Sequence, residues 1–336
     1  MRLAIIGASG LVGAEYLRII AARPAGITEV IPVASARSAG SSLELGGMEL
    51  SVRDLAQFDF AVCDYALFCV GDELSREYVP QALKAGCRVV DKSNAYRMDP
   101  AVPLVVGGAN DAAVTPETQL VANPNCSTII LVHGIKALTQ FGIRRVWVAT
   151  YQSMSGAGRD GVARLEGELR QYGLDPVSGR SDAPETAIAN NVIPGIGGMD
   201  AELRCSEERK LLQETRKILA MPELAIVPHA VRVPVSVGHS MAVSLEFADA
   251  VSAEAIREAW SRDSHVLLRD EGLPGPLSAS RHDMVEAGRL RAEEGVGNGW
   301  SFFLSGDNLN LGAALNGWRL LALLRAHHGN LEAKAG

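Results

Sequence analysis

Long apolar runs, CxxC pairs and a surplus of basic charge are all missing from this 336-residue sequence. No segment approaches the roughly 20 apolar residues that cross a bilayer, and the apolar run at residues 3–6 is too short for a signal peptide. The net charge of −7 argues against nucleic acid as the main partner. We therefore expect a cytoplasmic protein that binds neither membrane nor nucleic acid.

The five cysteines are odd in number and scattered along the chain. Because they form no cluster with one another or with histidine, the sequence predicts neither a disulfide framework nor a metal site, and it favours a reducing compartment. Cys63, Cys69 and Cys87 lie in or beside apolar, strand-like runs, where cysteine is usually a small buried residue. Only Cys126 and Cys205 lie near predicted helix starts.

The length predicts two domains. In the first part of the chain, helices at 14–21 and 73–85 and loop segments alternate with apolar runs at 2–6, 27–34, 65–70, 87–91, 104–106 and 120–122. Continuous apolar strands that alternate with helices predict a parallel sheet covered on both faces. We therefore expect a doubly wound, Rossmann-like α/β domain over residues 1–125.

The pattern changes after residue 123. Helices are predicted at 127–138, 160–172, 206–219 and 252–262, and strands at 145–151, 224–235 and 241–247. The last two strands look antiparallel, because prolines interrupt one and apolar and polar residues alternate in the other. Residues 126–311 are therefore expected to form an α+β domain with a mixed or antiparallel sheet. Segments 180–186 and 273–282 are the most loop-like.

A last helix is predicted over residues 312–326, with its end near Gly329. It carries an apolar stripe made of Leu311, Ala314, Leu315, Trp318, Leu321 and Ala322. Because such a stripe must be buried, we expect residues 312–336 to pack back on the first domain and complete it.

Gly7, Gly10 and Gly13 lie between the first predicted strand and the first helix. At such a turn the backbone can approach a pyrophosphate closely, and the helix N-terminus offers it N–H groups and a positive dipole end. The GxxGxxG spacing is weaker than GxGxxG, and glycine here also serves plain helix–sheet packing. The strand before it and the helix after it favour a dinucleotide site.

The end of the second strand favours NADP over NAD. An NAD site usually has an acidic residue there for the ribose hydroxyls, but residues 34–38 read ASARS. Arg37 and Ser38 can bind a 2′-phosphate instead. The alternative is that Arg37 is only a solvated loop charge.

Cys126 stands at or just before the start of a predicted helix, within the segment NPNCST (123–128). There the helix dipole and the unpaired N–H groups favour a thiolate, which is the nucleophilic form. Asn125 can donate an amide N–H to an oxyanion or a phosphate oxygen. A buried structural cysteine is the alternative, but an Asn-Pro-Asn turn is a poor sequence for a packed core. Cys205 also precedes a helix and lacks such a turn.

The segment YQSMSGAG (151–158) follows a strand and turns tightly into a helix. A glycine-rich loop at a strand end lets Gln152 project into a cleft. Ser155 and Gly156 can then meet the nicotinamide end of a bound dinucleotide. A simple turn is the alternative interpretation.

His239 lies between two predicted strands, where a histidine of near-neutral pKa can shuttle a proton to or from an oxygen. Arg232, a basic residue in an apolar strand, needs a carboxylate partner, which a substrate can provide. A core histidine and an internal ion pair are the alternatives, and Cys126 weighs against them. Glu207 and Lys210 share one helix face, and such a pair considered alone is most often on a solvated surface.

Together these segments resemble the aspartate-semialdehyde dehydrogenase family over nearly the full chain. The matching segments are GASGLVG, ASARSAG, DKSNAYRMDP, NPNCST, YQSMSGAG, ETRKIL, RVPVSVGHS and DNLNLGAALN. Members of that family use NADPH to reduce L-aspartyl 4-phosphate through a cysteine thioester, releasing phosphate and aspartate semialdehyde. This reaction leads to lysine (through diaminopimelate), methionine and threonine. Members are dimers built through the second domain, so the resemblance implies a homodimer.

The resemblance assigns roles to the residues around the reacting carbon. Cys126 resembles the nucleophile that becomes an acyl thioester, and His239 resembles the general acid/base. Gln152 and Arg232 resemble the pair that orients the substrate, with Arg232 on the α-carboxylate. Glu207 resembles a contact for the substrate amino group.

The resemblance also implies two binding sets. The phosphate-binding set is Arg97, Asn125 and Lys210. The NADP contacts are Gly7, Gly10, Leu11, Val12, Gly13, Arg37, Ser38, Ser155, Gly156 and Asn308. Residues 1–125 with 312–336 would then be the NADP-binding domain, and residues 126–311 the catalytic and dimerisation domain.

Three segments depart from the family pattern. Gly107-Gly108 stands where the family usually has Pro-Glu, Leu311 stands where it commonly has lysine, and residues 273–298 match poorly. They leave open a paralogue that acts on another acyl phosphate, such as N-acetylglutamyl phosphate, or on an acyl-CoA. A catalytically silent NADP-binding subunit is a second alternative, and the intact set of Cys126, Gln152, Arg232 and His239 speaks against it.

Overall fold

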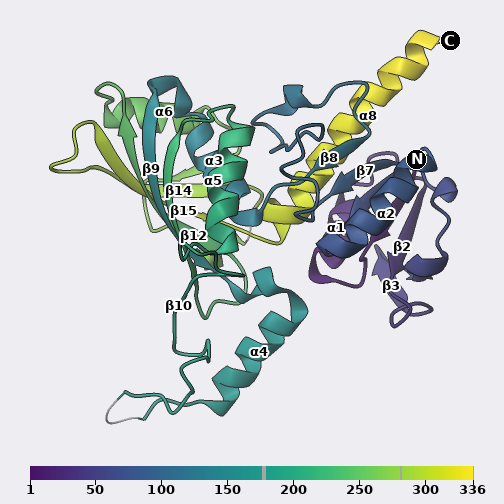
Figure 1. The fold of residues 1–336 in the computed structure, drawn as a ribbon, viewed down its shortest axis with the longest axis horizontal. Coiled ribbons are helices and arrows are strands. Elements are labelled where there is room, and N and C mark those ends of the chain that lie inside the picture. Colours follow the sequence, from purple (N-terminus) through teal and green to yellow (C-terminus); the bar gives the residue numbers. More distant parts are fainter. Residues whose placement is uncertain (176–178, 281, 336) are drawn as a thin grey trace. The chain divides into compact units, whose positions relative to one another are not determined.

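The structure is a computed structural model that describes residues 1–175, 179–280 and 282–335. It divides into two compact units (Figure 1). Unit 1 comprises Met1–Asn125 and Ala313–Gly336, and unit 2 comprises Cys126–Gly312. Positions 176–178, 281 and 336, which fall within the predicted domain ranges, lie outside the described residues. Position 281 also belongs to the loop-like segment 273–282.

Unit 1 is built on a six-stranded parallel sheet in the order β5-β2-β1-β6-β7-β8. Its strands are β1 (Arg2–Ile6), β2 (Glu29–Ala34), β5 (Arg53–Asp54), β6 (Tyr65–Phe68), β7 (Arg88–Asp91) and β8 (Leu120–Ala122). Residues 3–6 of β1 are completely buried, as expected for a strand covered on both faces. The predicted Rossmann-like sheet is confirmed, although the run at 104–106 forms only one bridge, from Leu104 to Ala122.

Unit 1 also contains a hairpin that the sequence analysis missed. Strands β3 (Ser42–Leu45) and β4 (Met48–Ser51) pair in antiparallel fashion. Gly46 and Gly47 join them, and both have positive φ, at 56° and 88°. Two glycines between short strands are the usual signal for such a turn, because only glycine adopts positive φ without steric cost.

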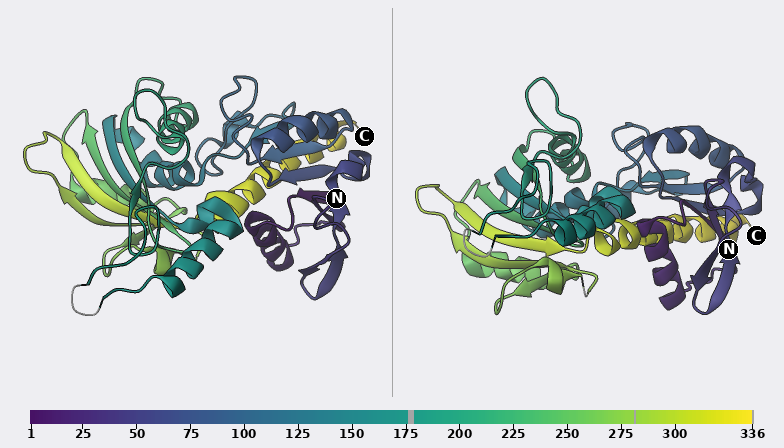
Figure 2. Two further views of the ribbon diagram at one scale, coloured as in Figure 1. Left: turned by 60° about the horizontal axis from the view of Figure 1, so that its bottom comes forward. Right: turned by 90° about the horizontal axis from the view of Figure 1, so that it is seen from below.

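The helices of unit 1 are α1 (Leu11–Ala22), α2 (Asp72–Lys84) and α8 (Asn316–Ala335), with 3₁₀ turns η1 (Leu55–Gln57), η2 (Phe60–Val62) and η3 (Asp111–Ala113). Helix α8 packs against β7 and lies beside the strands of this unit in both views of Figure 2. A β-carbon at Gly317 would collide with the hydroxyl of Tyr16 on α1. Glycine therefore permits this close approach of α8 to α1.

Helix α8 departs from the predicted stripe and from the predicted end near Gly329, since it continues to Ala335. It is preceded by a π-helical turn, η6 (Asn310–Leu315). Trp318 is only partly buried and Ala322 is exposed, whereas Leu320 and Leu324 are buried. A π turn has more residues than an α turn, so it rotates the residues that follow it away from the spacing expected for one α-helix.

Unit 2 is built on a seven-stranded mixed sheet in the order β10-β11-β9-β12-β15-β14-β13. Its strands are β9 (Ile143–Gln152), β10 (Ile193–Pro194), β11 (Ala225–Arg232), β12 (His239–Phe247), β13 (Val266–Arg269), β14 (Val285–Ala292) and β15 (Gly299–Gly306). The predicted mixed sheet is confirmed. The antiparallel expectation is correct for β12 and only partly correct for β11, which is antiparallel to β10 but parallel to β9. Two helices lie between β9 and β11 in the chain, and a parallel pair needs a connection of this length.

The helices of unit 2 are α3 (Cys126–Lys136), α4 (Gly158–Gln171), α5 (Ser206–Ile218), α6 (Ala253–Ser261) and α7 (Pro276–Ala279), with 3₁₀ turns η4 (Thr139–Phe141) and η5 (Met154–Ala157). Helices α3 and α5 pack against each other and against the sheet. Burial alternates along β9, so that Gln152 is buried while Tyr151 is exposed. Gln152 therefore faces the helices, and Tyr151 lies on the opposite face, stacked on Phe303 of β15.

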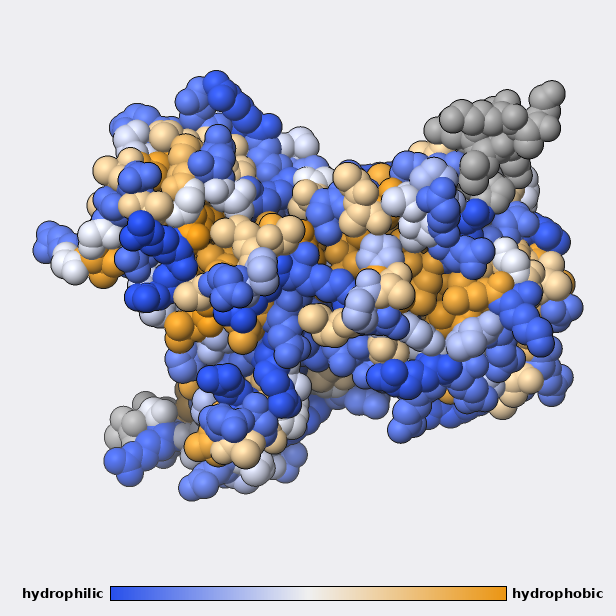
Figure 3. Space-filling view, turned by 45° about the horizontal axis from the view of Figure 1, so that its top comes forward, coloured by the Kyte–Doolittle hydropathy of each residue, from blue (hydrophilic) through white to orange (hydrophobic). Residues whose placement is uncertain are grey.

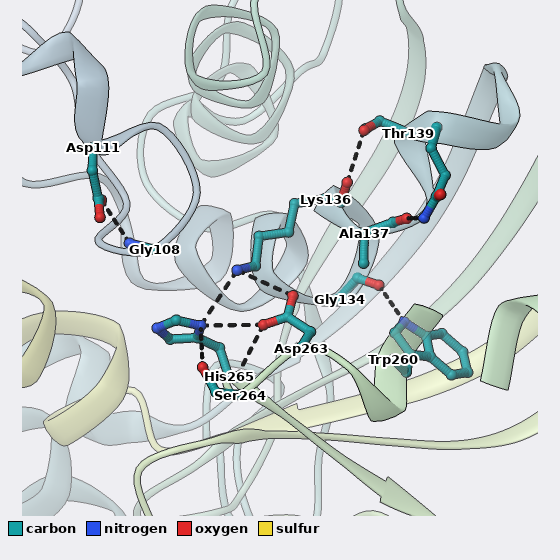
Figure 4. Close-up of polar contacts among 11 residues, drawn as sticks. Gly108, Asp111, Gly134, Lys136, Ala137, Thr139, Trp260, Asp263, Ser264 and His265 are labelled. Carbon is teal, nitrogen blue, oxygen red and sulfur yellow. Dashed lines mark hydrogen bonds and ion pairs between the residues drawn. The ribbon is translucent and has the colours of Figure 1, made fainter. Parts of the chain in front are cut away.

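Lys136 anchors the far end of α3 to the connection between α6 and β13 (Figure 4). Its ammonium lies 3.1 Å from a carboxylate oxygen of Asp263 and 3.3 Å from Nδ1 of His265. Trp260 of α6 adds a hydrogen bond of 2.8 Å to the carbonyl of Gly134 on α3. Burial by itself would raise the pKa of Asp263, but hydrogen bonds from His265 and the Lys136 charge outweigh it and hold that pKa well below its ordinary value.

Replacing Asp263 with asparagine is expected to lower the free energy of unfolding by about 2 kcal/mol at pH 7, because Lys136 loses a charged partner. A depressed pKa stabilises the fold above the unfolded value of about 4 and loses that contribution as pH falls further. Urea unfolding should therefore show a smaller difference between the two proteins at pH 3. The exposed pair Glu258–Arg262 provides the control, since Glu258→Gln should have little effect. A loss that does not depend on pH would contradict the ionic origin.

The surface indicates little more about function. The face shown in Figure 3 is largely hydrophilic, with apolar groups in smaller patches. Among the described residues, no helix combines the length and the apolar character needed to span a membrane.

Candidate active site

Cys126 is the first residue of α3. It therefore lies at the helix end where backbone N–H groups lack helical partners and the dipole is positive, which stabilises negative charge. Cys126 is partly exposed, whereas Cys205, at the N-cap of α5, is fully buried. A β-carbon at Gly312 would lie only 2.9 Å from that of Cys126, so glycine lets the π turn pass beside the cysteine.

His239, the first residue of β12, faces this cysteine from 113 residues further along the chain. The distance between the Cys126 sulfur and Nε2 of His239 is 3.2 Å. His239 is completely buried. Burial and the positive charge of Arg232 lower the pKa of His239 to about 3, so the imidazole is neutral at physiological pH. The site thus pairs a cysteine with an uncharged histidine.

Gln152, at the end of β9, connects α3 to α5. Its amide nitrogen donates to the hydroxyl of Ser127 at 2.7 Å and to a carboxylate oxygen of Glu207 at 3.2 Å. The other oxygen of Glu207 accepts a hydrogen bond of 2.6 Å from Lys210. Glu207 is only 8% exposed, so the interpretation of Glu207 and Lys210 as a solvated surface pair is wrong. The fold turns this face of α5 toward Gln152.

Arg232, at the end of β11, donates a hydrogen bond of 2.5 Å to the carbonyl of Ser153. Within residues 1–175, 179–280 and 282–335 it forms no ion pair. Burial lowers the pKa of Arg232, and the negative charges of Cys126 and Glu207 oppose that shift. Gly156 lies opposite, where a β-carbon would be 3.0 Å from the guanidinium and 3.5 Å from the His239 ring. A side chain at position 156 would crowd both.

Ser155 and Asn308 lie behind His239. Oδ1 of Asn308 accepts the N–H of Gly238 at 2.8 Å, and its amide nitrogen lies 2.9 Å from the Ser155 hydroxyl. Both side chains are buried. Unit 2 therefore brings together all of its predicted site residues: Cys126, Gln152, Ser155, Gly156, Glu207, Lys210, Arg232, His239 and Asn308.

The glycine loop of unit 1 has the geometry of a phosphate cradle. Gly7 has a φ of +89°, and its N–H and that of Ala8 both bond to the carbonyl of Val33. A β-carbon at Gly13 would lie 2.5 Å from the Ala8 carbonyl oxygen, so α1 passes closely over the loop. Gly10 caps α1, which places Leu11 and Val12 in the first turn, where free N–H groups point outward.

A cavity of about 420 Å³ opens beside this loop, lined by residues that include Gly7, Gly10, Ala36 and Tyr78. Its size suits part of a dinucleotide. Arg37 is exposed and Ser38 partly buried, in the turn that follows β2. Asp54 of β5, which the sequence analysis did not single out, also lines the cavity, and it caps η1 through the N–H of Ala56.

Arg97 and Asn125 belong to unit 1, and both are buried. The guanidinium of Arg97 donates to the carbonyls of Asn123 at 3.0 Å and of Lys92 at 2.6 Å. Asn316, at the start of α8, donates to the side-chain oxygen of Asn123 at 2.7 Å. Arg97 and Asn316 thus hold the turn that carries Asn125 from two sides.

Sequence reasoning missed three residues that organise these sites: Ser127, Ser153 and Asn316. Ser127 and Ser153 lie beside Cys126 and Gln152 inside the quoted motifs, but nothing in the motifs shows what their polar atoms bind. Asn316 contacts residues about two hundred positions earlier. In the described part of the chain, no group of three or more His, Cys, Asp or Glu side chains could hold a metal ion.

A parallel sheet with a glycine cradle and a separate cysteine–histidine site are typical of NAD(P)-binding oxidoreductases, and this chain is of that class. Residues 2–115 match the family model described as semialdehyde dehydrogenase, NAD binding domain, and residues 135–311 match the one described as semialdehyde dehydrogenase, dimerisation domain. Together with the relatives described next, these matches show that the chain belongs to the aspartate-semialdehyde dehydrogenase family, which confirms the resemblance found in the sequence.

Known proteins resemble this chain over almost its whole length. The aspartate-semialdehyde dehydrogenase of a Synechocystis strain is 38% identical over 332 residues, which cover 96% of this chain and 97% of the relative. That of Legionella pneumophila is 37% identical over 336 residues, covering 97% and 96%. The crystal structure of Vibrio cholerae aspartate semialdehyde dehydrogenase II, complexed with ASA, has a TM-score of 0.90 at 33% identity. It covers 97% of this chain and 98% of its own.

Proposed function

We propose that this protein is an NADPH-dependent aspartate-semialdehyde dehydrogenase, which converts L-aspartyl 4-phosphate to L-aspartate 4-semialdehyde and phosphate in the biosynthesis of lysine, methionine and threonine. The observation that carries the proposal is the 3.2 Å approach of the sulfur of Cys126, a partly exposed residue, to the buried ring of His239. Gln152, Glu207 and Arg232 lie in the same unit and supply polar groups suited to an amino acid. Relatives of this name match 96% and 97% of the chain.

In the first step, the Cys126 thiolate attacks the acyl carbon and phosphate leaves, which yields a thioester. Backbone N–H groups at the start of α3 and the amide of Asn125 would stabilise the oxyanion that forms on the way. Arg97 and Lys210 are proposed to bind the phosphate through charge-assisted hydrogen bonds. Reduction of the thioester then gives a thiohemiacetal, and His239 acts as the donor to its oxygen. The aldehyde departs as the cysteine is released.

Three side chains are proposed to hold the amino-acid end of the substrate. Arg232 would bind the α-carboxylate, since its fork of N–H groups matches a carboxylate. Glu207 would accept a hydrogen bond from the amino group. Gln152, already bonded to Glu207, would orient the acyl group. An acetylated amino group would lose its charge and weaken this contact, which favours a free amino acid.

NADPH, when bound, supplies the hydride. We propose that Gly7, Gly10 and Gly13, with Leu11 and Val12, cradle its pyrophosphate, because the loop combines positive φ with a helix N-terminus. Residues 1–125 and the C-terminal helix would form the NADP-binding domain, and 126–311 the catalytic domain. The remaining proposed contacts are Arg37, Ser38, Ser155, Gly156 and Asn308.

Replacing Arg37 with alanine is expected to weaken NADPH binding about 10- to 100-fold, because a charge-assisted bond to the 2′-phosphate is lost. NADH binding should hardly change. Fluorescence titration with both cofactors measures the difference. Arg53→Ala is the matched control, since Arg53 is exposed on the neighbouring strand and pairs with Glu29. If Arg37→Ala weakens both cofactors equally, Asp54 becomes the better candidate for cofactor discrimination, with NAD as the cofactor.

Substrate choice decides the proposed function. The purified protein should reduce NADP⁺ with aspartate semialdehyde and phosphate, and the reaction should require both. N-acetylglutamate semialdehyde with phosphate, and aspartate semialdehyde with coenzyme A, test the other acyl reductases. Preference for either would overturn the assignment, and absence of turnover with intact NADPH binding would indicate a silent subunit.

We also propose that the protein is a homodimer built through unit 2, whose residues match a dimerisation-domain model. On the sheet face opposite α3 and α5, Tyr151 and Val227 are 38% and 42% exposed, and Tyr151 stacks on Phe303. Exposed apolar side chains on one face of a sheet suit a second copy of the same surface. Sedimentation at micromolar concentration would show a dimer, and a monomer would contradict the proposal.

Five free cysteines favour the cytoplasm as the location of the protein.

A further inference from the structure

Ser153 binds three groups of the site at once, although the sequence analysis gave this residue of the motif YQSMSGAG no role. It is completely buried. Its N–H donates to Nδ1 of His239 at 3.1 Å, and its carbonyl accepts from Arg232 at 2.5 Å. Its hydroxyl lies 3.0 Å from Nδ1 of His239 and 3.0 Å from Oδ1 of Asn308. One residue thus contacts both the histidine and the arginine.

The backbone N–H of Ser153 determines where His239 carries its proton. A backbone N–H can only donate, so Nδ1 must present a lone pair to it. The ring is neutral, because burial and the charge of Arg232 disfavour the imidazolium, and therefore it carries a single proton. That proton is on Nε2, the nitrogen 3.2 Å from the Cys126 sulfur. The hydroxyl of Ser153 can donate to Nδ1 or to Asn308, and either bond is compatible with this tautomer.

We propose that Ser153 is a positioning residue that holds His239 in its Nε2–H tautomer. His239 then acts as a hydrogen-bond donor, first toward the Cys126 thiolate and later toward the substrate oxygen. The negative charge of the thiolate is stabilised by the start of α3 and by Arg232. This inference rests on the proposed function for its catalytic meaning.

From the thioester to the aldehyde, the reaction balances with His239 as a donor only. Hydride adds to the thioester carbon and converts R–C(=O)–S–Cys into the alkoxide R–CH(O⁻)–S–Cys. The alkoxide expels the cysteine as a thiolate and leaves R–CHO, so no net proton is needed between thioester and aldehyde. A fixed Nε2–H can stabilise the alkoxide throughout, as donors in an oxyanion hole do.

Nitrogen-15 NMR of histidine-labelled protein tests the tautomer directly. Two-bond couplings to the ring carbon protons distinguish Nδ1–H from Nε2–H. The chain has seven histidines, so His239→Gln identifies the resonance by its disappearance. We expect a protonated Nε2 and an unprotonated Nδ1 at neutral pH in the unliganded protein. A protonated Nδ1 overturns the proposal. Because no substrate is required, this result stands whether or not aspartate semialdehyde is turned over.

Ser153→Pro tests the role of the N–H. Ser153 has a φ of −71° and a ψ of 159°, and it follows a strand, so proline fits this backbone and removes the donor. We expect a shift toward the Nδ1–H tautomer and a fall in kcat of at least about tenfold, since a wrong histidine tautomer slows catalysis strongly. Ser153→Ala keeps the N–H, so its His239 should keep the wild-type tautomer. An unchanged tautomer in Ser153→Pro, or an equal tautomer shift in Ser153→Ala, would refute the assignment to the N–H.

Discussion

A Cys126→Ala variant is expected to lose turnover of aspartate semialdehyde by about 10⁴-fold or more. The reason is covalent: without the sulfur no thioester can form, and binding groups alone retain only a small part of the catalysis. NADPH binding should remain, because the proposed cofactor cradle belongs to unit 1 and does not include this residue. Initial rates measure the turnover, and a fluorescence titration with NADPH measures the cofactor affinity.

Cys205→Ala is the matched control for Cys126. Both cysteines stand at the beginning of a helix of unit 2, but Cys205 is fully buried and Cys126 is not. The control variant should turn over at nearly the wild-type rate, with any loss confined to stability. Wild-type turnover in Cys126→Ala would exclude the covalent route. Equal losses in the two variants would point to a general effect of removing a helix-end cysteine.

An Arg232→Leu variant is expected to raise KM for aspartate semialdehyde by about 100-fold. A partly buried guanidinium that binds a carboxylate contributes several kcal/mol, and leucine offers the substrate no positive charge. The KM for phosphate should change little, because Arg97 and Lys210 are the proposed phosphate ligands. In the same variant the pH profile of kcat/KM should move to higher pH, because Arg232 stabilises negative charge on Cys126.

Arg232→Lys separates charge from geometry. Lysine keeps the positive charge but cannot form two parallel bonds to a carboxylate, so an intermediate KM is expected. Arg209→Leu, which removes a partly exposed ion pair with Asp200 in the same unit, should leave both KM values unchanged. If the KM for phosphate rises as much as that for the aldehyde in Arg232→Leu, then Arg232 binds phosphate and its proposed role is wrong.

The parallel sheet of unit 1 was predictable because its signals are local. Five of its six strands are short apolar runs, and glycine precedes both α1 and α2; the exception is β5 (Arg53–Asp54), which is charged and was not predicted. The sheet of unit 2 was less predictable. Whether β11 runs parallel or antiparallel to β9 depends on the connection between them, and residues 224–235 themselves read the same either way. Which residues of α8 are buried depends on a preceding π turn, and α-helical spacing does not reveal that turn.

The same contrast between local signals and tertiary packing applies to the residues of the site. Cys126 at a helix start, the glycine loop and the missing carboxylate after β2 are properties of a few consecutive residues, and the sequence alone indicated their chemistry. Glu207 and Lys210 show the opposite case. Their spacing is that of a surface pair, and only the packing of α5 against α3 buries Glu207 against Gln152.

The sequence by itself determined which chemical groups this protein has and which element carries each, because helix starts, tight turns and apolar strands are encoded over a few neighbouring residues. The tertiary structure alone decided which groups meet: Cys126 with His239, and the N–H of Ser153 with the far side of the same ring. Such contacts join segments about a hundred residues apart, and their distances and proton positions follow from how the sheet and helices pack. No local pattern specifies them.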